Sequence, residues 1–509
     1  MVINTAGRPL MLESLAVLRL PNRVSLLHMA AAAVVGLLLG AGCLVASPVL
    51  VLAALVGIGG AIVIARRPEI GLLVILVCTS SVVFEDVLPL VPIGMGSLHI
   101  PDLILLGLLG QIVVRRLFDP QFKFVRTPID LPLLIFFGLL VLPTAVAILQ
   151  SRVEVEVARR EIRVVSYYLA FFVVTNLVRD SRQLRYLLSG LTMLATVVAA
   201  AMVAQFVLGG SVSIIPGRVE ALQTGDSVYA DVTRILPPGQ SLVLVATIAS
   251  VPILALGQST TRPTLAWLRF CLLGLALLLT FNRGFWGALI LAVLVMVVFA
   301  SRCDRARLVK VGAAVAGVAG TVLLVAVAGS VDSRATLLVR ASLERLGTFR
   351  SSSTLQESSL QWRAVENRYA LSQIESHPLV GLGLGARYRP FDRRLDHYGM
   401  AWDATRYIHN GHLWLLLVAG VPGYLAFLWL TWTAATRGLG HSRSIPDDHR
   451  RAVTMGFVSG YLGLLAAAFV APLFSAWHWT PVIGVMLAVM VNASQADRQL
   501  MVPQPLRRE

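Results

Sequence analysis

The sequence predicts an all-α, polytopic membrane protein: a transmembrane helix bundle with one large helical loop on its outer side. Three observations support this fold class. The mean hydropathy is +0.78, charged residues make up only 14% of the chain, and the apolar residues are collected into long blocks. Soluble globular chains normally carry about 25% charged residues. With 57% hydrophobic residues and only four cysteines among 509 residues, the sequence excludes a disordered chain and a disulfide-rich scaffold.

The apolar blocks are long enough to cross a membrane. A spanning helix needs about 20 mainly apolar residues. The blocks predict about fourteen spans, or about twelve if closely spaced pairs near the N-terminus are single spans. The expected spans are 24–45, 48–65, 70–91, 102–118, 131–150, 162–178, 184–208, 239–256, 264–281, 283–301, 308–329, 410–433, 453–471 and 474–493.

The blocks divide the chain into three parts. Residues 1–329 are expected to form a bundle of about eleven spans, interrupted by an outer loop at 209–238. Residues 330–408 are expected to form the large outer loop, and residues 409–509 the last spans and a cytoplasmic tail. Apolar residues of the large loop recur at helical spacing, which predicts amphipathic helices. These residues are Leu337, Ala341 and Leu346, then Trp362, Val365 and Tyr369.

Arginines in the short loops predict the orientation. Positively charged residues favour cytoplasmic loops. If both termini are cytoplasmic, clusters such as Arg66–Arg67 and Arg302–Arg307 fall inside. The segment 151–163 breaks this alternation, and its mixed arginines and glutamates predict an amphipathic helix at the membrane surface. The net charge of +16 therefore reflects topology, and no nucleic-acid partner is expected.

A histidine motif opens the first span after the large loop. Gly420 follows His409 by eleven residues, and Gly423 follows by fourteen. Eleven helical steps return to within about 20° of the start, which predicts that all three share one face. Asn410 is a good N-cap residue for this helix. Taken alone, such a histidine is more often an ordinary polar residue of the membrane interface.

Four motifs together resemble the bacterial O-antigen ligases. The spacing His-Asn, nine residues, Gly-x-x-Gly is complete from His409 to Gly423. Trp362-Arg363 followed by 374–385 is similar to the stretch in the large periplasmic loop of that family. Residues 280–284 (Thr-Phe-Asn-Arg-Gly) are similar to a family motif in which serine stands where this chain has asparagine. Arg234 before Pro-Pro-Gly-Gln completes the set, so the resemblance covers about 234–423.

The resemblance implies a C-type glycosyltransferase of the bacterial inner membrane. Such enzymes move a glycan from a polyprenyl (undecaprenyl) diphosphate donor to a hydroxyl of a glycan or glycolipid acceptor at the periplasmic face. The resemblance also implies that no metal and no cofactor is used. Ligases transfer a finished chain to the lipopolysaccharide core, whereas related polymerases extend the chain itself, and the sequence leaves this choice open. The competing class is a non-catalytic transporter of lipid-linked glycans, which the absence of an internal repeat disfavours.

Candidate residues follow from the chemistry of a diphosphate leaving group. Arginine grips phosphate bidentately, so Arg234 and Arg283 are expected to stabilise the departing diphosphate. His409 is the candidate general base, because its intrinsic pKa suits proton removal at neutral pH. A direct displacement by the acceptor hydroxyl inverts the anomeric centre.

Further residues are expected around this centre. The substrate-binding candidates are Arg363, Arg387, Arg389, Asn410 and His412. For the three arginines, pairing with Glu366, Glu375 or Asp392 is an equally good interpretation. The structural motif glycines are Gly381, Gly383, Gly420 and Gly423. Gly381 and Gly383 are expected to form a tight turn, since glycine supplies backbone freedom.

Overall fold

The chain forms two compact units, Met1–Arg66 and Arg67–Glu509. The computed structural model describes residues 48–80, 82–83, 90–93, 96–209, 212–224, 227–257, 263–328, 334–347, 358–392 and 403–500. The first unit is described by its helix α2 (Pro48–Arg66). The span expected at 24–45 lies outside the described residues. All features below belong to the second unit.

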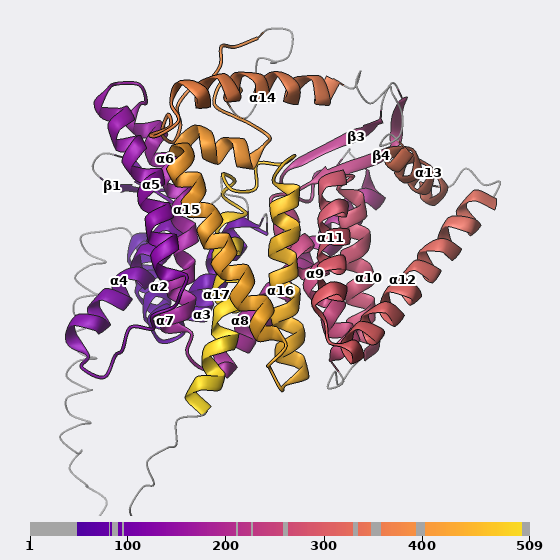
Figure 1. The fold of residues 1–509 in the computed structure, drawn as a ribbon, viewed down its shortest axis with the longest axis horizontal. Helices are drawn as coiled ribbons and strands as arrows, with labels where there is room; N and C mark the ends of the chain where they lie inside the picture. Colours follow the sequence, from indigo (N-terminus) through magenta and orange to yellow (C-terminus); the bar gives the residue numbers. More distant parts are fainter. Residues whose placement is uncertain are drawn as a thin grey trace, which may run out of the picture. The chain divides into compact units, whose positions relative to one another are not determined.

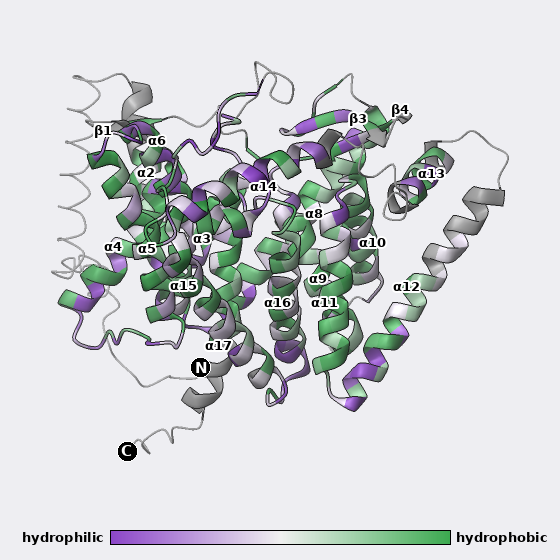
Figure 2. Ribbon diagram, turned by 45° about the horizontal axis from the view of Figure 1, so that its top comes forward, coloured by the Kyte–Doolittle hydropathy of each residue, from purple (hydrophilic) through white to green (hydrophobic). Residues whose placement is uncertain are grey.

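Helices form where the apolar blocks predict them, and α6, α13 and α14 form in the segments expected to hold amphipathic helices (Figure 1). In chain order they are α3 (Pro68–Thr79), α4 (Ile100–Phe118), α5 (Asp130–Leu149), α6 (Val155–Ser166), α7 (Ala170–Leu177), α8 (Ser181–Leu208), α9 (Gln240–Leu256), α10 (Pro263–Leu279), α11 (Arg283–Phe299), α12 (Arg302–Ala328), α13 (Arg334–Gly347), α14 (Ser358–Ser376), α15 (Gly411–Ser442), α16 (Asp448–Ala467) and α17 (Thr480–Leu500). Helices α9, α11 and α16 pack together, and α5 packs against α15. Figure 2 shows apolar residues along most of α9 and α11.

Three described helices are both long and apolar enough to cross a membrane, namely Asp130–Leu149, Ser181–Leu208 and Gly411–Gly440. Several expected spans are shorter than predicted. The block at 70–91 gives a helix that ends at Thr79, and the block at 162–178 is divided between α6, a 3-10 turn at Tyr167–Leu169, and α7. The chain is therefore a mostly helical membrane protein, and the count of twelve to fourteen spans stays a prediction.

Two short antiparallel hairpins interrupt the helical pattern. β1 (Val91–Ile93) pairs with β2 (Gly96–Leu98), and β3 (Arg218–Thr224) pairs with β4 (Ser227–Leu236). The all-α prediction holds for most of the described chain but missed these strands. The second hairpin occupies the outer loop expected at 209–238. Its apolar side chains join a buried cluster with α13 and the end of α10, consisting of Leu222, Val232, Leu279, Phe281, Leu338 and Ala341.

The segment 330–408 contains the helices α13 and α14. Figure 1 shows both at the same end of the helices as α6 and the β3–β4 hairpin. In α13 the expected apolar face is used at Ala341, which is fully buried, and at Leu337, which is partly buried. The side chain of Leu346 lies outside the described residues. In α14 the expected face is used in part: Trp362 and Val365 are partly buried and Tyr369 is exposed, whereas Glu366 and Ala370 are buried. The reason is that α14 packs against α15, and there its Glu366 meets a polar partner rather than an apolar surface.

Helix α15 is broken by a kink at Gly420, where φ is 64° and ψ is −173°. Pro422 cannot donate to the carbonyl of Val418, so that acceptor is left open. The loop that follows α14 in the chain supplies the missing hydrogen bonds. Gly383 N–H donates to the Val418 carbonyl at 3.0 Å, and Val421 N–H donates to the Pro378 carbonyl at 2.7 Å. The kink is therefore a docking point for residues 378–383.

This kink corrects the expected helix face. His409 precedes the first residue of α15, and Gly420 interrupts the helix, so His409, Gly420 and Gly423 do not lie on one regular helical face. The glycines still permit close approach. A Cβ at Gly420 would lie 2.8 Å from the carbonyl oxygens of Pro378 and Leu379, and a Cβ at Gly381 would lie 2.6 Å from the Gly420 nitrogen. Gly381 and Gly420 are thus packed backbone against backbone.

Candidate functional site

His409 is held by a buried carboxylate. Its ring Nδ1 lies 2.9 Å from one carboxylate oxygen of Glu366 and 3.1 Å from the other, and its backbone N–H donates to Glu366 at 3.0 Å. The side chain of Glu366 is only 1% exposed, whereas that of His409 is 25% exposed. An ionised carboxylate can only accept hydrogen bonds, so the proton of a neutral imidazole resides on Nδ1. This tautomer leaves the Nε2 lone pair as the basic position.

Two aromatic side chains flank the imidazole. The Tyr407 ring stands edge-on to it with centroids 4.9 Å apart, and the Trp362 ring lies 6.3 Å away. Burial raises the pKa of the Tyr407 hydroxyl, and the charge of Glu366 raises it further. Arg363 and Arg218 oppose this rise, which places both guanidinium groups within electrostatic reach of Tyr407. The ring of His409 is therefore fixed on several sides.

Arg234 lies on strand β4, directly opposite Glu220 on β3. Its Nε donates to the carbonyl of Thr280 at 3.1 Å, and its Nη1 lies 3.3 Å from the Glu220 carboxylate. Arg218 also pairs with Glu220, at 2.7 Å. Burial lowers the pKa of Arg234, Glu220 raises it, and repulsion from Arg218 and Arg363 lowers it. Glu220 therefore pairs with two guanidinium groups, and the charge of a third, Arg363, also acts on Arg234.

Arg283 begins helix α11 in the turn that Arg234 contacts. Asn282 is the N-cap, since its side-chain oxygen accepts the Gly284 N–H at 3.0 Å. Serine and asparagine are both favoured caps, which explains why asparagine can replace the serine of the family motif. The turn is locked by Phe281, which is fully buried and has a positive φ of 46°. Arg283 lies three residues after Thr280, and its side chain is half-buried.

Arg363 lies within electrostatic reach of both Arg234 and Tyr407, the neighbour of His409. It lies three residues before Glu366 on α14, so the two project from the same side of that helix. Its charge acts on both Arg234 and Tyr407. The structure thus brings together residues from four of the predicted motifs: the β4 strand, the turn before α11, helix α14 and the start of α15.

The remaining candidates have different surroundings. Arg387 is exposed, and its Nε lies 3.7 Å from the carboxylate of Asp403. The sequence had suggested Glu366, Glu375 or Asp392 as its partner and had not considered Asp403. Arg389 is buried, and its Nη1 donates to the Pro390 carbonyl at 3.3 Å. Both belong to a loop whose Tyr388 N–H donates to the Thr405 carbonyl. Their contact with substrate stays a prediction.

Asn410 and His412 have structural contacts at the start of α15. The Asn410 side chain caps the helix by accepting the N–H groups of His412 and Leu413 at 3.0 and 3.1 Å. The His412 ring is buried and stacks on Phe469, with centroids 4.1 Å apart. Its Nε2 lies 2.8 Å from the Leu465 carbonyl. These contacts orient the helix that follows His409.

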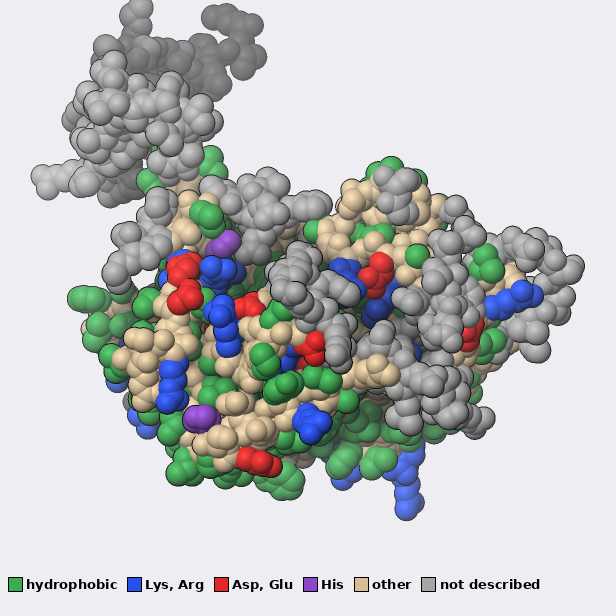
Figure 3. All heavy atoms as spheres, turned by 90° about the horizontal axis from the view of Figure 1, so that it is seen from above, with side chains coloured by type: hydrophobic (Ala, Val, Ile, Leu, Met, Phe, Trp, Pro, Cys, Tyr) green, Lys and Arg blue, Asp and Glu red, His purple; other side chains and the backbone are tan. Residues whose placement is uncertain are grey.

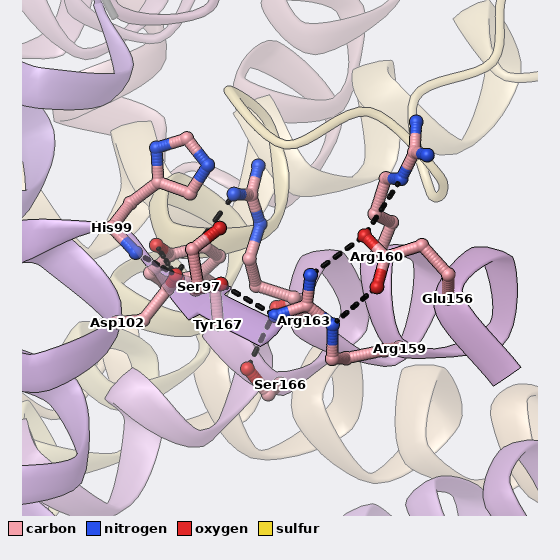
Figure 4. Close-up of polar contacts among 9 residues, drawn as sticks. All are labelled: Ser97, His99, Asp102, Glu156, Arg159, Arg160, Arg163, Ser166 and Tyr167. Carbon is pink, nitrogen blue, oxygen red and sulfur yellow. Dashed lines mark hydrogen bonds and ion pairs between the residues drawn. The ribbon is translucent and has the colours of Figure 1, made fainter. Parts of the chain in front are cut away.

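Basic and acidic side chains are mixed on the face that carries α6 and α14 (Figure 3). Figure 4 shows the part of this network around α6. Buried Asp102 accepts the Tyr167 hydroxyl at 2.6 Å and lies 3.9 Å from Arg163. Arg159 pairs with Glu156 and donates to the Ser97 carbonyl, so it links α6 to the β1–β2 hairpin. The amphipathic helix expected at 151–163 is therefore tied to the bundle by its arginines.

Several residues of the site were missed by sequence reasoning. Glu366 was considered only as an ion-pair partner for arginine, and Arg218 and Glu220 were not considered. The signal for Glu366 was its spacing of three residues from Arg363 inside a family-like motif. Arg218 and Glu220 gave no signal, because strand pairing brings them beside Arg234. Among the described residues, no group of three or more His, Cys, Asp or Glu side chains is placed to hold a metal ion.

Comparison with known proteins agrees with these motifs. Residues 268–428 match the family model described as O-antigen ligase. The matched region begins within α10 and includes Arg283, Arg363, Glu366, His409 and the kink at Gly420. No curated protein matches the chain. The family match supports the assignment of this chain to the O-antigen ligase superfamily, whose members are membrane-embedded transferases of ligase or polymerase type.

Proposed function

We propose that the chain transfers a glycan from a polyprenyl (undecaprenyl) diphosphate donor to an acceptor hydroxyl at the periplasmic face of the bacterial inner membrane. The observation that supports this most directly is the contact of His409 with buried Glu366, next to the arginine group of Arg234, Arg218 and Arg363. A base beside several guanidinium groups suits an acceptor hydroxyl and a diphosphate leaving group.

The proposed reaction is a direct displacement. The acceptor hydroxyl gives its proton to Nε2 of His409 while its oxygen forms a bond to the anomeric carbon. The bond from that carbon to the diphosphate breaks, and its electron pair stays on the diphosphate oxygen, so the anomeric centre is inverted. Glu366 stabilises the imidazolium that forms, as a carboxylate does in a catalytic triad.

The arginines are assigned to the leaving group. Arg234 and Arg363, with Arg283 from the adjacent turn, neutralise the charge that builds on the diphosphate. Because guanidinium groups fill the cationic role, the proposed mechanism needs no metal ion. Arg234 keeps its charge despite burial, since arginine stays protonated in proteins.

The test uses purified protein and lipid-linked donor, with His409→Ala and Arg283→Ala as variants. Removal of a general base lowers rates by about 10²–10⁴-fold, so His409→Ala is expected to lose at least 100-fold of its transfer rate. His449→Ala is the matched control, because His449 is an exposed histidine on α16. Ordinary turnover in both test variants would overturn the roles assigned to these two residues. Absence of transfer by the wild-type protein would overturn the enzyme assignment and favour a transporter.

The chain length of the product distinguishes the two members of the superfamily. A ligase, which we favour because the histidine motif is complete, joins one finished block to a glycolipid acceptor. A polymerase of the same superfamily would use the same residues but give a ladder of products. Gel analysis of the wild-type product is therefore sufficient to decide between them.

A further inference from the structure

A charged cavity lies at the end of the bundle remote from His409. It has a volume of about 230 Å³ and lies between the α11–α12 turn, the end of α15 and the start of α16. Helix α15 begins beside His409 and has 32 residues, so it extends roughly 48 Å at 1.5 Å per residue. This exceeds the hydrocarbon thickness of about 30 Å. The cavity is therefore separate from the site described above.

Two acidic residues of the cavity are already neutralised. Arg451 lies 3.2 Å from Asp304 and also pairs with Asp448, and Arg307 lies 3.7 Å from Asp448. Arg451 further donates to the Ile445 carbonyl at 3.0 Å. Arg451 is thus part of the structural framework that joins α12 to α16.

Arg443 contributes the excess positive charge. Its Nε donates to the Phe299 carbonyl at 2.9 Å, and its guanidinium lies 5.9 Å from the centre of the Phe299 ring. Neither contact neutralises a charge. Among the described residues, no carboxylate lies within ion-pair distance of Arg443. With three arginines and two aspartates in its lining, the cavity favours an anion.

An exposed apolar stripe leads to the cavity. Ile290, Leu294 and Val298 follow one another at intervals of four residues on α11 and are 61%, 55% and 61% exposed. This spacing places them on one face of the helix. The stripe ends three residues before Ser301, which lines the cavity. A free phosphate would use the arginines but not the stripe, whereas a phospholipid would use both.

We propose that this cavity binds the headgroup phosphate of an anionic phospholipid. Arg443 and Arg307 donate to the phosphate oxygens, and an acyl chain lies along the apolar stripe of α11. The volume suits this ligand, because about 230 Å³ far exceeds the roughly 10–15 Å³ that one water molecule needs and so leaves room for a phosphate group. The proposal does not depend on the transferase assignment.

The experiment measures binding of fluorescent phosphatidylglycerol to the purified full-length protein in a neutral detergent. An arginine near an anionic headgroup contributes about 1 kcal/mol, which corresponds to about five-fold in affinity. Arg443→Gln is expected to weaken binding about five-fold, and the double variant Arg307→Gln/Arg443→Gln about thirty-fold. Arg437→Gln is the matched control, because Arg437 is an exposed arginine of α15 outside the cavity lining. Its affinity should equal that of the wild type.

Further arms separate the possible ligands. Phosphatidylcholine, which has no net charge, should bind at least ten-fold more weakly. Leu294→Gln should reduce phosphatidylglycerol binding without unfolding the protein, because Leu294 is exposed on α11. Displacement of the lipid by inorganic phosphate at equal affinity would overturn the proposal and identify a small-anion site. Unchanged lipid binding by a folded double variant would overturn it as well. Arg443→Lys, which keeps the charge, provides the folded comparison if the double variant loses its thermal transition.

Discussion

The contact between His409 and Glu366 gives the sharpest prediction. Replacement of Glu366 by Gln keeps the shape of the side chain but removes its charge. Glu366 accepts two hydrogen bonds from His409, at 2.9 Å from the ring and 3.0 Å from the backbone. Hydrogen bonds to charged groups contribute roughly 1.5–3 kcal/mol, against 0.5–1.5 kcal/mol for neutral ones. The change therefore costs about 2–3 kcal/mol in the transition state, or about 30–150-fold in kcat.

The assay is glycan transfer from purified lipid-linked donor, with kcat and KM measured separately. Because Glu366 acts through His409 and not on the donor, we expect kcat to fall while the KM for the donor changes little. The matched control is Glu375→Gln, the same substitution at an exposed position of the same helix. The control should keep the wild-type kcat.

The double variant tests whether the two residues act as one unit. If Glu366 works through His409, then Glu366→Gln/His409→Ala should be no slower than His409→Ala alone. Additive losses in the double variant would refute the reasoning, as would wild-type kcat in Glu366→Gln. A thermal unfolding scan of each variant separates a loss of activity from a loss of fold.

Three other predictions follow from single contacts. Arg234→Gln should lower kcat/KM for the donor by about ten-fold or more, because a bidentate phosphate contact is lost, whereas the more exposed Arg218→Gln should lose less; equal losses would contradict this ranking. Gly420→Ala should lower the free energy of unfolding by about 3 kcal/mol, since its φ of 64° and the carbonyl oxygens 2.8 Å away exclude a Cβ, while Gly440→Ala, with open space around it, should change the melting temperature little. Burial raises the pKa of Asp403, but hydrogen bonds from Thr405 and the charges of Arg406 and Arg387 outweigh it, so the pKa is lowered overall. The stability that Asp403 contributes is present above its unfolded pKa of about 3.9 and is lost as the pH falls through its folded pKa, so Asp403→Asn should lower the melting temperature more at pH 7 than at pH 3.

The sequence by itself determined the features that depend on local residues. Apolar blocks predicted the apolar helices of the second unit. A helix in lipid makes its backbone hydrogen bonds within its own segment, so a run of apolar neighbours along the chain is enough to indicate it. The caps at Asn282 and Asn410 were also local, since a cap bonds to nitrogens two or three residues away. The order and spacing of the motifs indicated the superfamily that the family match supports.

Only the tertiary structure decided how the motifs meet. Glu366 and His409 are 43 residues apart, and the packing of α14 on α15 makes them partners, which the periodicity of α14 did not predict. The backbone of Gly420 packs against the carbonyl groups of residues 378–379. Arg234 lies opposite Glu220 in a β-hairpin, where the sequence predicted only a loop. The physical reason is the same in each case: a buried hydrogen bond takes its partner from whichever segment the fold brings within 3 Å, and spacing along one helix or strand does not contain that information.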